Sequence, residues 1–353
     1  MKLGDAAHAV FGTPELAFSL FAYLTPQDLA QCVRVCKQWL YHAEPILWRN
    51  FSPEAYYYAV PPSEAIPELI RNLPYIRTVM LDVRNRAVLR HLSYGSPSSP
   101  TCDGSAAVPR AACNRLRRLE IEDWHAFESI QKLEEHTGPL LPSIVPLLNH
   151  NLRLTHVALP FQDVDIDDPV LAAISNLKHL QHFSVKGYSM SPTRSRTMSL
   201  LLQACLPLPK LTELWINLEI SWLDENTGVP SLQTIIKETA KARFSQTPTP
   251  GRIKSLRLPF RPEGYENPLA LPLLQSGLLD LESCTVLPFT RDSTAVDVEQ
   301  MVREYCPNIK HLRLPSFGRT LNGFQKACAF IRGCSGLQSF VFDFYDGSPE
   351  ACD

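Results

Sequence analysis

One spacing of apolar residues recurs along most of this 353-residue chain. An apolar residue is followed by two others, a second apolar residue, one other and a third apolar residue. The occurrences are Ile76-Val79-Leu81, Leu116-Leu119-Ile121, Leu154-Val157-Leu159, Leu180-Phe183-Val185, Leu211-Leu214-Ile216, Ile253-Leu256-Leu258, Leu281-Cys284-Val286, Ile309-Leu312-Leu314 and Leu337-Phe340-Phe342. The last two apolar positions alternate as in a short strand, and the intervals leave room for a crossover helix between parallel strands.

The helical part of one interval is visible in the sequence. Between Val286 and Ile309, the residues Val298, Val302 and Tyr305 fall at helical spacing. A unit of one strand and one helix cannot bury its own apolar face, so successive units must stack to form a continuous core. We therefore expect an α/β solenoid with parallel strands.

Two units carry a cysteine three residues before the first apolar position: Cys306 to Leu314 reads CPNIKHLRL, and Cys334 to Phe342 reads CSGLQSFVF. The array resembles the leucine-rich repeat, in particular its cysteine-containing variety. The resemblance implies a right-handed horseshoe with parallel strands on its concave face. Intervals of up to 42 residues exceed the usual ~20–29, which predicts insertions. The stretch 93–113 is rich in Ser, Pro, Ala and Gly and is expected to be a flexible insertion.

The first 51 residues have a different character. Thr13-Pro14-Glu15 and Thr25-Pro26-Gln27-Asp28 both resemble helix starts, with a capping Thr, a first-turn Pro and an early acid. A third helix through Trp39 is expected, and Pro45 is expected to open another. The apolar faces of such short helices exceed what they can hide from water, so this module should dock onto a partner.

The stretch PELAFSLFAYLTPQDLAQCVRVCKQWLYHAEPILWRNF, which begins at Pro14, resembles an F-box. The F-box is the helical module that binds the Skp adaptor of cullin-based ubiquitin ligases. The matching elements are the opening Pro-Glu-Leu, the turn around Thr25-Pro26, the Val-Cys-Lys-x-Trp segment and the closing Pro-x-Leu-Trp-Arg. Carried over position by position, the resemblance implies adaptor-facing or supporting roles for Pro14, Leu16, Leu20, Leu24, Leu29, Val35 and Trp39.

The expected organisation is a helical F-box at 1–51, a connecting segment at 52–75, the repeat array at 76–344 and a tail at 345–353. Such a chain is expected to be the substrate-recognition subunit of a Skp-cullin-F-box ubiquitin ligase. It would bind the Skp adaptor, and through it cullin, at one end and a target protein at the other, with no catalysis of its own. Two alternatives stay open: an interaction scaffold without ligase activity, and a hydrolase or transferase built on a solenoid.

Composition narrows the partners and the compartment. A net charge of -2 supplies no global field for nucleic acid, and no apolar run reaches the ~18 residues of a membrane helix. Ten cysteines without a C-x-x-C pair favour reduced thiols. We therefore expect a cytoplasmic or nuclear protein that binds neither nucleic acid nor membrane.

Candidate metal and cofactor sites are weak. Asp163-x-Asp165-x-Asp167 begins like a calcium loop but lacks the glycine and the glutamate that complete one. His179-x-x-His182 is interpreted as part of a repeat strand, where alternate residues point to opposite faces. No phosphate-binding glycine loop or nucleophile elbow occurs, so no cofactor is expected.

The residues between the buried strand positions should project onto the concave face. The middle positions are Met80, Glu120, Ala158, Ser184, Trp215, Arg257, Thr285, Arg313 and Val341, with His156, His182, Lys186, His311 and Asn217 beside them. Trp and Arg are over-represented among residues that dominate binding energy. We expect Trp215, Arg257 and Arg313, flanked by His182 and Lys186, to bind a target, for instance an acidic or phosphorylated segment. The alternative is that Trp215 packs under a loop and the arginines are ordinary solvated charges.

Overall fold

A computed structural model describes residues 11–52, 62–82, 86–94, 113–122, 141–160, 168–187, 194–218, 232–246, 252–257, 273, 275–284, 295–314 and 321–342. The chain divides into two compact units, Met1–Leu154 and Thr155–Asp353. The division falls inside the expected repeat array, and each unit is described separately. The domain boundaries drawn from the sequence stay a prediction.

The first unit joins the N-terminal helices to the first strands. In chain order its described elements are α2 (Pro14–Phe21), α3 (Pro26–Cys32), α4 (Lys37–Leu47), β1 (Asn50–Phe51), α6 (Pro62–Asn72), the 3₁₀ turn η1 (Leu73–Tyr75), β2 (Thr78–Asp82), α7 (Arg86–Tyr94), β3 (Arg118–Glu122) and α9 (Leu141–His150).

The N-terminal helices begin where their capping residues predict. Proline is the first residue of both α2 and α3, and Thr25 caps α3: its Oγ1 accepts from the Asp28 N–H at 3.2 Å and donates to the Asp28 carboxylate at 2.7 Å. The prediction that Pro45 opens a further helix is wrong, because α4 runs on through Pro45 to Leu47. A proline in the last turn of a helix removes one backbone hydrogen bond without ending the helix early.

The helices lead directly into a parallel sheet. Trp48, at the end of α4, stacks on Phe51 of β1 with ring centroids 6.2 Å apart. β1 pairs in parallel with β2, and β2 pairs in parallel with β3. The expected connecting segment therefore follows a first short strand and contains α6 and η1.

The second unit alternates strands and helices. Its described elements are β4 (His156–Pro160), α10 (Asp168–Ser175), β5 (His182–Gly187), α11 (Arg194–Cys205), β6 (Glu213–Leu218), α12 (Leu232–Gln246), β7 (Ile253–Arg257), β8 (Leu279–Cys284), α14 (Ala295–Tyr305), β9 (His311–Leu314), α15 (Leu321–Gly333) and β10 (Ser339–Phe342).

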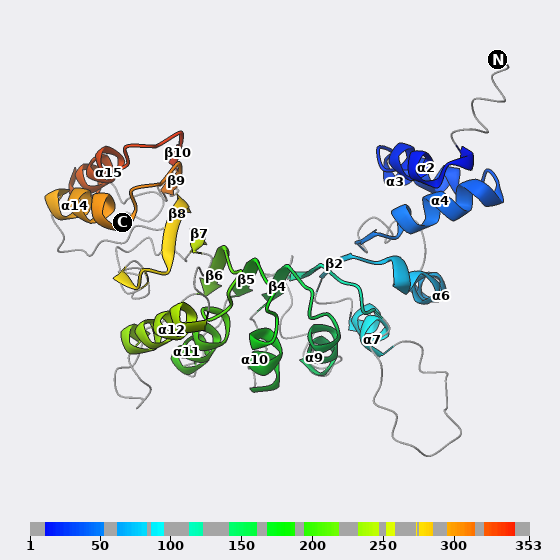
Figure 1. The fold of residues 1–353 in the computed structure, drawn as a ribbon, viewed down its shortest axis with the longest axis horizontal. Coiled ribbons are helices and arrows are strands. Elements are labelled where there is room, and N and C mark those ends of the chain that lie inside the picture. Colours follow the sequence, from blue (N-terminus) through cyan, green and yellow to red (C-terminus); the bar gives the residue numbers. More distant parts are fainter. Residues whose placement is uncertain are drawn as a thin grey trace, which may run out of the picture. The chain divides into compact units, whose positions relative to one another are not determined.

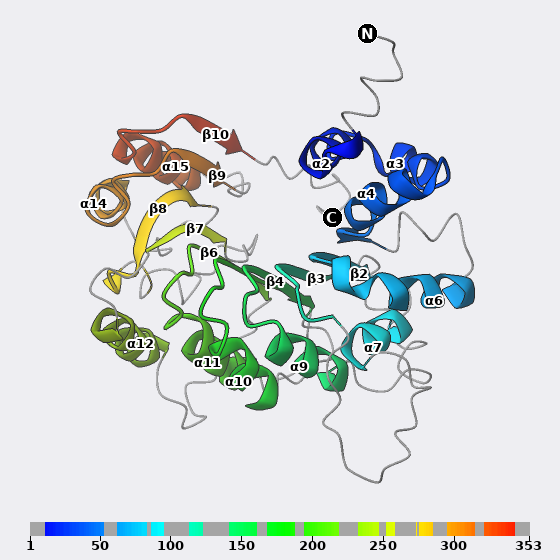
Figure 2. The same cartoon turned by 45° about the vertical axis from the view of Figure 1, so that its right-hand side comes forward.

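Every pairing between neighbouring strands from β4 to β10 is parallel, with one register shift between β7 and β8. The parallel strands and the helix expected between Val286 and Ile309 are confirmed. Helices α10, α11 and α12 lie on one side of the strands that they connect (Figure 1), and the second view shows the same arrangement (Figure 2). The strand residues that point toward this side, such as Phe183 and Leu214, are buried.

In eight of the nine repeats, a buried residue three positions before the first apolar residue marks the turn from helix to strand, and the corresponding position of the ninth lies outside the described residues. The eight residues are Leu73, Cys113, Asn151, Leu177, Leu208, Leu278, Cys306 and Cys334. In most of these turns the carbonyl of that residue accepts from the first apolar residue of the repeat, as Leu177 does from Leu180 at 2.9 Å. The position takes a leucine or a cysteine in every described repeat except the one with Asn151, because it faces the core. Burial raises the pKa of the thiols, to about 12 at Cys113 and to about 11 at Cys334.

Two buried polar side chains form hydrogen bonds to backbone groups at these turns. The Asn151 carboxamide accepts from the Leu116 N–H and donates to the carbonyls of Cys113 and Leu147, each at 2.8 Å. In the second unit, the buried guanidinium of Arg243 on α12 donates to the carbonyls of Leu206 and Leu211 at 3.1 and 2.9 Å. Each side chain thereby links one repeat to the turn of the preceding repeat.

Several segments for which the sequence makes a prediction lie mostly or entirely outside the described residues. Ser93 and Tyr94 belong to α7, and Cys113 is buried; the rest of the insertion expected at 93–113 lies outside the described residues. The acidic stretch from Asp163 to Asp167 and the tail 345–353 also lie outside them. The parallel strands are compatible with a solenoid, and the horseshoe curvature stays a prediction.

Candidate functional site

The N-terminal helices share a small internal core. Its buried members are Ala17, Phe21, Leu29, Cys32 and Ala43. Phe11, Leu24, Val33, Trp39, Ile46 and Leu47 pack against it while remaining partly exposed. The rings of Phe11, Phe21 and Trp39 lie with their centroids 4.8–5.8 Å apart, which is the range of favourable aromatic pairs.

A second set of apolar side chains on the same helices faces solvent. Leu16 and Leu20 are one helical turn apart on α2 and are 52% and 46% exposed, and Tyr23 continues this stripe at 91%. Phe18, Val35, Leu40 and Tyr41 are exposed as well. This set, whose α2 members lie on both sides of the buried Ala17 and Phe21, is named the exposed apolar face. Soluble proteins rarely expose so many large apolar side chains in a module of this size unless the surface binds a partner.

The adaptor-binding residues predicted from the sequence divide between these two sets. Pro14, Leu16, Leu20 and Val35 are exposed, so they can contact a partner directly. Leu24 and Trp39 are half-buried against the internal core, and Leu29 is only 4% exposed. Leu29 can therefore support the module but not face a partner, because Ala17, Phe21 and the other core residues already surround it.

Sequence reasoning missed the exposure of Phe18, Tyr23, Leu40 and Tyr41. All four are large and apolar, and Tyr23 belongs to the turn that carries the sequence resemblance. A helical wheel for α2 alone could have found Phe18, because Ala17 and Phe21 occupy the buried face.

Residues 14–54 match the family model described as F-box-like. The chain contains an F-box-like domain. This domain comprises α2, α3, α4 and β1, and it carries both the internal core and the exposed apolar face. No curated protein matches the chain.

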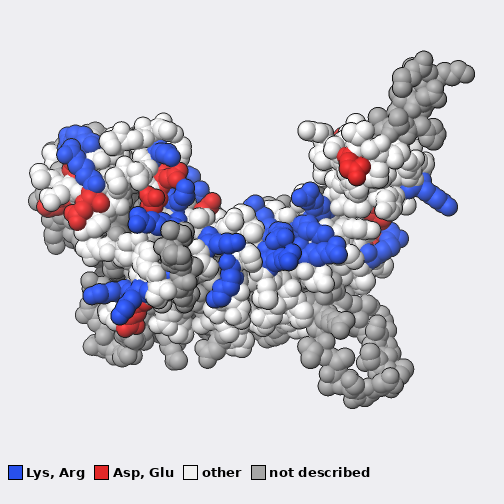
Figure 3. Space-filling view, viewed as in Figure 1, with Lys and Arg blue, Asp and Glu red and all other residues white. Residues whose placement is uncertain are grey.

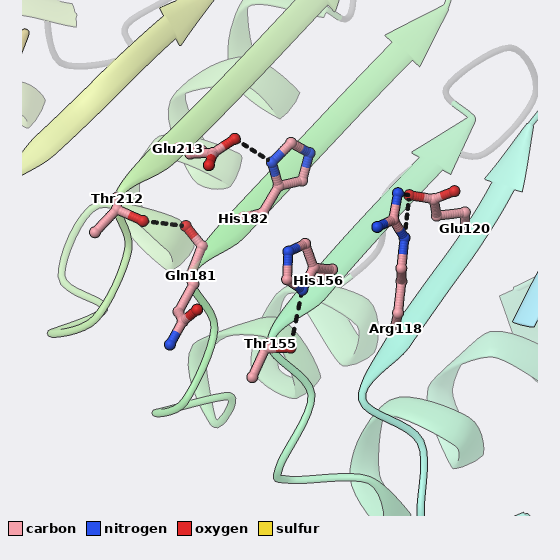
Figure 4. Close-up of polar contacts among 8 residues, drawn as sticks. All are labelled: Arg118, Glu120, Thr155, His156, Gln181, His182, Thr212 and Glu213. Atoms are coloured by element: carbon pink, nitrogen blue, oxygen red, sulfur yellow. Dashed lines mark hydrogen bonds and ion pairs between the residues drawn. The ribbon is translucent and has the colours of Figure 1, made fainter. Parts of the chain in front are cut away.

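The second candidate surface lies on the strands of the second unit. The parallel register sets His156 beside His182, His182 beside Glu213, and Glu213 beside Ser255. The His156 and His182 rings stack with centroids 5.6 Å apart, and His182 Nδ1 lies 2.8 Å from a Glu213 carboxylate oxygen (Figure 4). His182 thus belongs to a polar row across four strands rather than to an isolated position.

The neighbouring row contains the predicted target-binding pair. Trp215 and Arg257 are opposite each other on β6 and β7, and the guanidinium carbon of Arg257 lies 4.8 Å from the centre of the Trp215 ring. This cation–π contact keeps the indole and the guanidinium together on one patch. Trp215 is half-buried and Arg257 is exposed.

Arg313 is exposed on β9 and pairs in register with Val341 of β10. Thr285, which would connect it to Arg257 in the strand register, lies outside the described residues. Lys186 is opposite Pro160 and Asn217 in the strand register, and its side chain is outside the description.

Three positions expected on the open face are buried. Ala158 and Ser184, adjacent in register, are 6% and 1% exposed, and Glu120 is 7% exposed with an ion pair of 2.6 Å to Arg118. Ser184 is also adjacent in register to Trp215, whose large ring shields this small side chain from water. His179 also differs from expectation: it lies in the turn before β5 and contacts Lys210 instead of sharing a strand with His182.

Charged side chains also bridge the strands of the second unit. Glu282 of β8 accepts from Lys254 of β7 at 2.7 Å and from Lys310, just before β9, at 3.0 Å. These two ammonium groups lower the pKa of the Glu282 carboxyl to about 2. The three residues are an ordered charge group along one edge of the strands.

Within the described ranges, no group of three or more His, Cys, Asp or Glu residues could hold a metal ion. Cys32, Cys36, Cys113, Cys205, Cys306, Cys328 and Cys334 are free thiols. None of the helices in the described parts of the chain combines the length and the apolar character that crossing a membrane requires.

Proposed function

We propose that this protein is the substrate-recognition subunit of a Skp-cullin-F-box ubiquitin ligase. The observation that carries the proposal is the exposed apolar face on the matched F-box-like domain. F-box domains are typically adaptors, and this one supports binding to a Skp adaptor and, through it, to cullin. The strands that follow would present a target protein, and ubiquitin transfer would be performed by the partner proteins through proximity.

Binding of the adaptor is proposed to bury Leu16, Leu20 and Val35 while Leu24, Leu29 and Trp39 hold the helices beneath them. Pro14 is the first residue of α2 and so sets where the helix that carries Leu16 and Leu20 begins. Truncating a side chain at the centre of an interface costs about 1–2 kcal/mol, so three truncations should weaken binding by more than about a hundredfold.

The experiment is capture of a purified Skp adaptor by the full chain. A triple variant, Leu16→Ala, Leu20→Ala and Val35→Ala, should lose capture and keep its fold, because the three side chains are exposed. The matched control is Leu152→Ala, Phe244→Ala and Val296→Ala, which removes exposed apolar side chains outside the F-box-like domain. Equal capture by the wild type and the first variant would contradict the adaptor assignment.

For the other end of the chain we propose that Trp215, Arg257, Arg313, His182 and Lys186 contribute to target binding. The pairing of Trp215 with Arg257 supports this role, since a large ring and a cation together can bind both apolar and anionic groups. The double variant Trp215→Ala and Arg257→Ala should capture the adaptor normally and lose bound target. A scaffold without ligase activity is the alternative, and it predicts adaptor capture with no ubiquitin transfer in a reconstituted ligase.

A further inference from the structure

Five arginines of the first unit lie near one another, and three of them directly precede its strands. The arginine cluster consists of Arg49, Arg77, Arg115, Arg117 and Arg153. Arg49 immediately precedes β1, Arg77 immediately precedes β2, and Arg117 immediately precedes β3. In Figure 3, lysine and arginine atoms form a continuous patch where Figure 1 places β2.

Backbone hydrogen bonds hold these arginines in neighbouring places. The carbonyl of Arg49 accepts from the Arg77 N–H at 2.9 Å, and the carbonyl of Arg77 accepts from the Arg117 N–H at 2.7 Å. Arg117 Nη1 in turn donates to the carbonyl of Arg153 at 3.2 Å. Because neighbouring strands lie about 4.8 Å apart, the backbones of Arg49, Arg77 and Arg117 follow one another at close, regular steps.

Three members of the cluster lack a carboxylate partner within the described ranges. Arg49, Arg115 and Arg153 are exposed, and none of them forms an ion pair with a carboxylate of the described residues. Burial lowers the pKa of the half-buried Arg77, and the charges of Arg115, Arg49 and Arg117 lower that pKa further. An anion placed among these side chains would relieve the repulsion between them.

The dimensions and the surroundings favour a short peptide over a longer polyanion. From β1 to β3, two strand spacings cover roughly 10 Å, which matches about three residues of extended chain. Next to the cluster, Arg118 is already paired with the buried Glu120 (Figure 4), which limits the patch to the cluster. A nucleic acid carries a phosphate at every nucleotide and would extend beyond so short a patch, whereas a short acidic peptide would not. The net charge of -2 also gives the chain no extended field for nucleic acid.

We propose that the arginine cluster binds an extended acidic segment of a partner protein, through carboxylate or phosphate groups on alternate residues. Arginine suits both anions because its planar fork donates two parallel hydrogen bonds. The surface needs neither Trp215 nor the exposed apolar face, and so it adds a second protein contact to the first unit.

The test measures peptide binding to the full chain by fluorescence anisotropy. The probes are about ten residues long, enough to exceed the patch, with serine alternating with glutamate, phosphoserine or glutamine. The glutamate or the phosphoserine peptide should bind and the glutamine peptide should not, and the stronger binder identifies the anion. Affinity should fall as salt shortens the range of electrostatic attraction.

The variant Arg115→Gln, Arg117→Gln and Arg153→Gln should weaken binding by at least about tenfold, since each exposed ion pair contributes a factor of roughly two to five. The three positions lie outside residues 14–54, so adaptor capture should be unchanged, and a failure of the adaptor assignment would be seen separately. Substituting lysine at the same positions keeps the charge and should retain most of the binding.

The matched control is Lys237→Gln, Lys241→Gln and Arg252→Gln, three exposed cations of the second unit. An equal loss in this control would overturn the proposal, because binding would then follow net charge alone. Absence of binding by both acidic peptides would overturn it as well. Tighter binding of a single-stranded RNA of equal charge would replace the proposed acidic peptide with a nucleic acid.

Discussion

Asn151 offers the sharpest test of how the repeats are held together. Its side chain is buried, and it supplies one acceptor and two donors to backbone groups of two successive repeats. In most of the other turns a backbone carbonyl accepts the hydrogen bond that corresponds to the one from the Leu116 N–H to Asn151. Replacing Asn151 with leucine keeps the branched shape and the number of heavy atoms and removes all three hydrogen bonds.

The cost follows from the groups left behind. A buried donor without a partner costs about 1–3 kcal/mol, and the Leu116 N–H would become one. The carbonyls of Cys113 and Leu147 would each lose a donor, which is tolerated better because a carbonyl has two lone pairs. We expect Asn151→Leu to lower the free energy of unfolding by about 3 kcal/mol.

The assay is urea unfolding combined with hydrogen exchange of the segment that contains Leu116. The control is Asn308→Leu, because Asn308 is exposed and donates a single hydrogen bond to Asp280 at 2.8 Å. That change should cost no more than about 0.5 kcal/mol. If the two variants differ by less than about 0.5 kcal/mol, or if exchange near Leu116 is not accelerated, the reasoning is refuted.

Three further perturbations can be measured in the second unit. Arg243→Leu should destabilise it by about 2–4 kcal/mol in urea unfolding, since two buried carbonyls lose a charged donor; an effect below that of a surface substitution would contradict this. Gly333→Ala should lower the melting temperature, because an added Cβ would lie 2.9 Å from Val302 between α14 and α15. The pKa of Glu282 is about 2 rather than 4.5, so its stabilising contribution is present above pH 4.5 and is lost as the pH falls toward 2. Glu282→Gln should therefore reduce the loss of unfolding free energy between pH 4.5 and 2. An unchanged loss would show that the charge group of Glu282, Lys254 and Lys310 does not cause it.

The strands and the F-box-like domain could be predicted from local sequence alone. The spacing seen in Leu180-Phe183-Val185 determines which residues face the core, because alternation along a strand is a property of neighbouring residues. Helix starts such as Thr25-Pro26 are equally local. The predictions failed where a local signal was overridden: Pro45 lies inside α4, and Ser184 is buried on a face expected to be open.

The functional surfaces depend on contacts between residues far apart in the sequence. Trp215 meets Arg257, and Asn151 reaches Leu116, only because parallel strands separated by helices of unequal length come into one register. On α2, Leu16 and Ala17 are adjacent in the chain, yet packing against α4 decides that Ala17 is buried and Leu16 faces solvent. The sequence by itself determined the repeated strands and the N-terminal module, since both follow from short-range periodicity. Tertiary structure decided which side chains stay exposed and which charges gather, because these depend on which elements pack side by side.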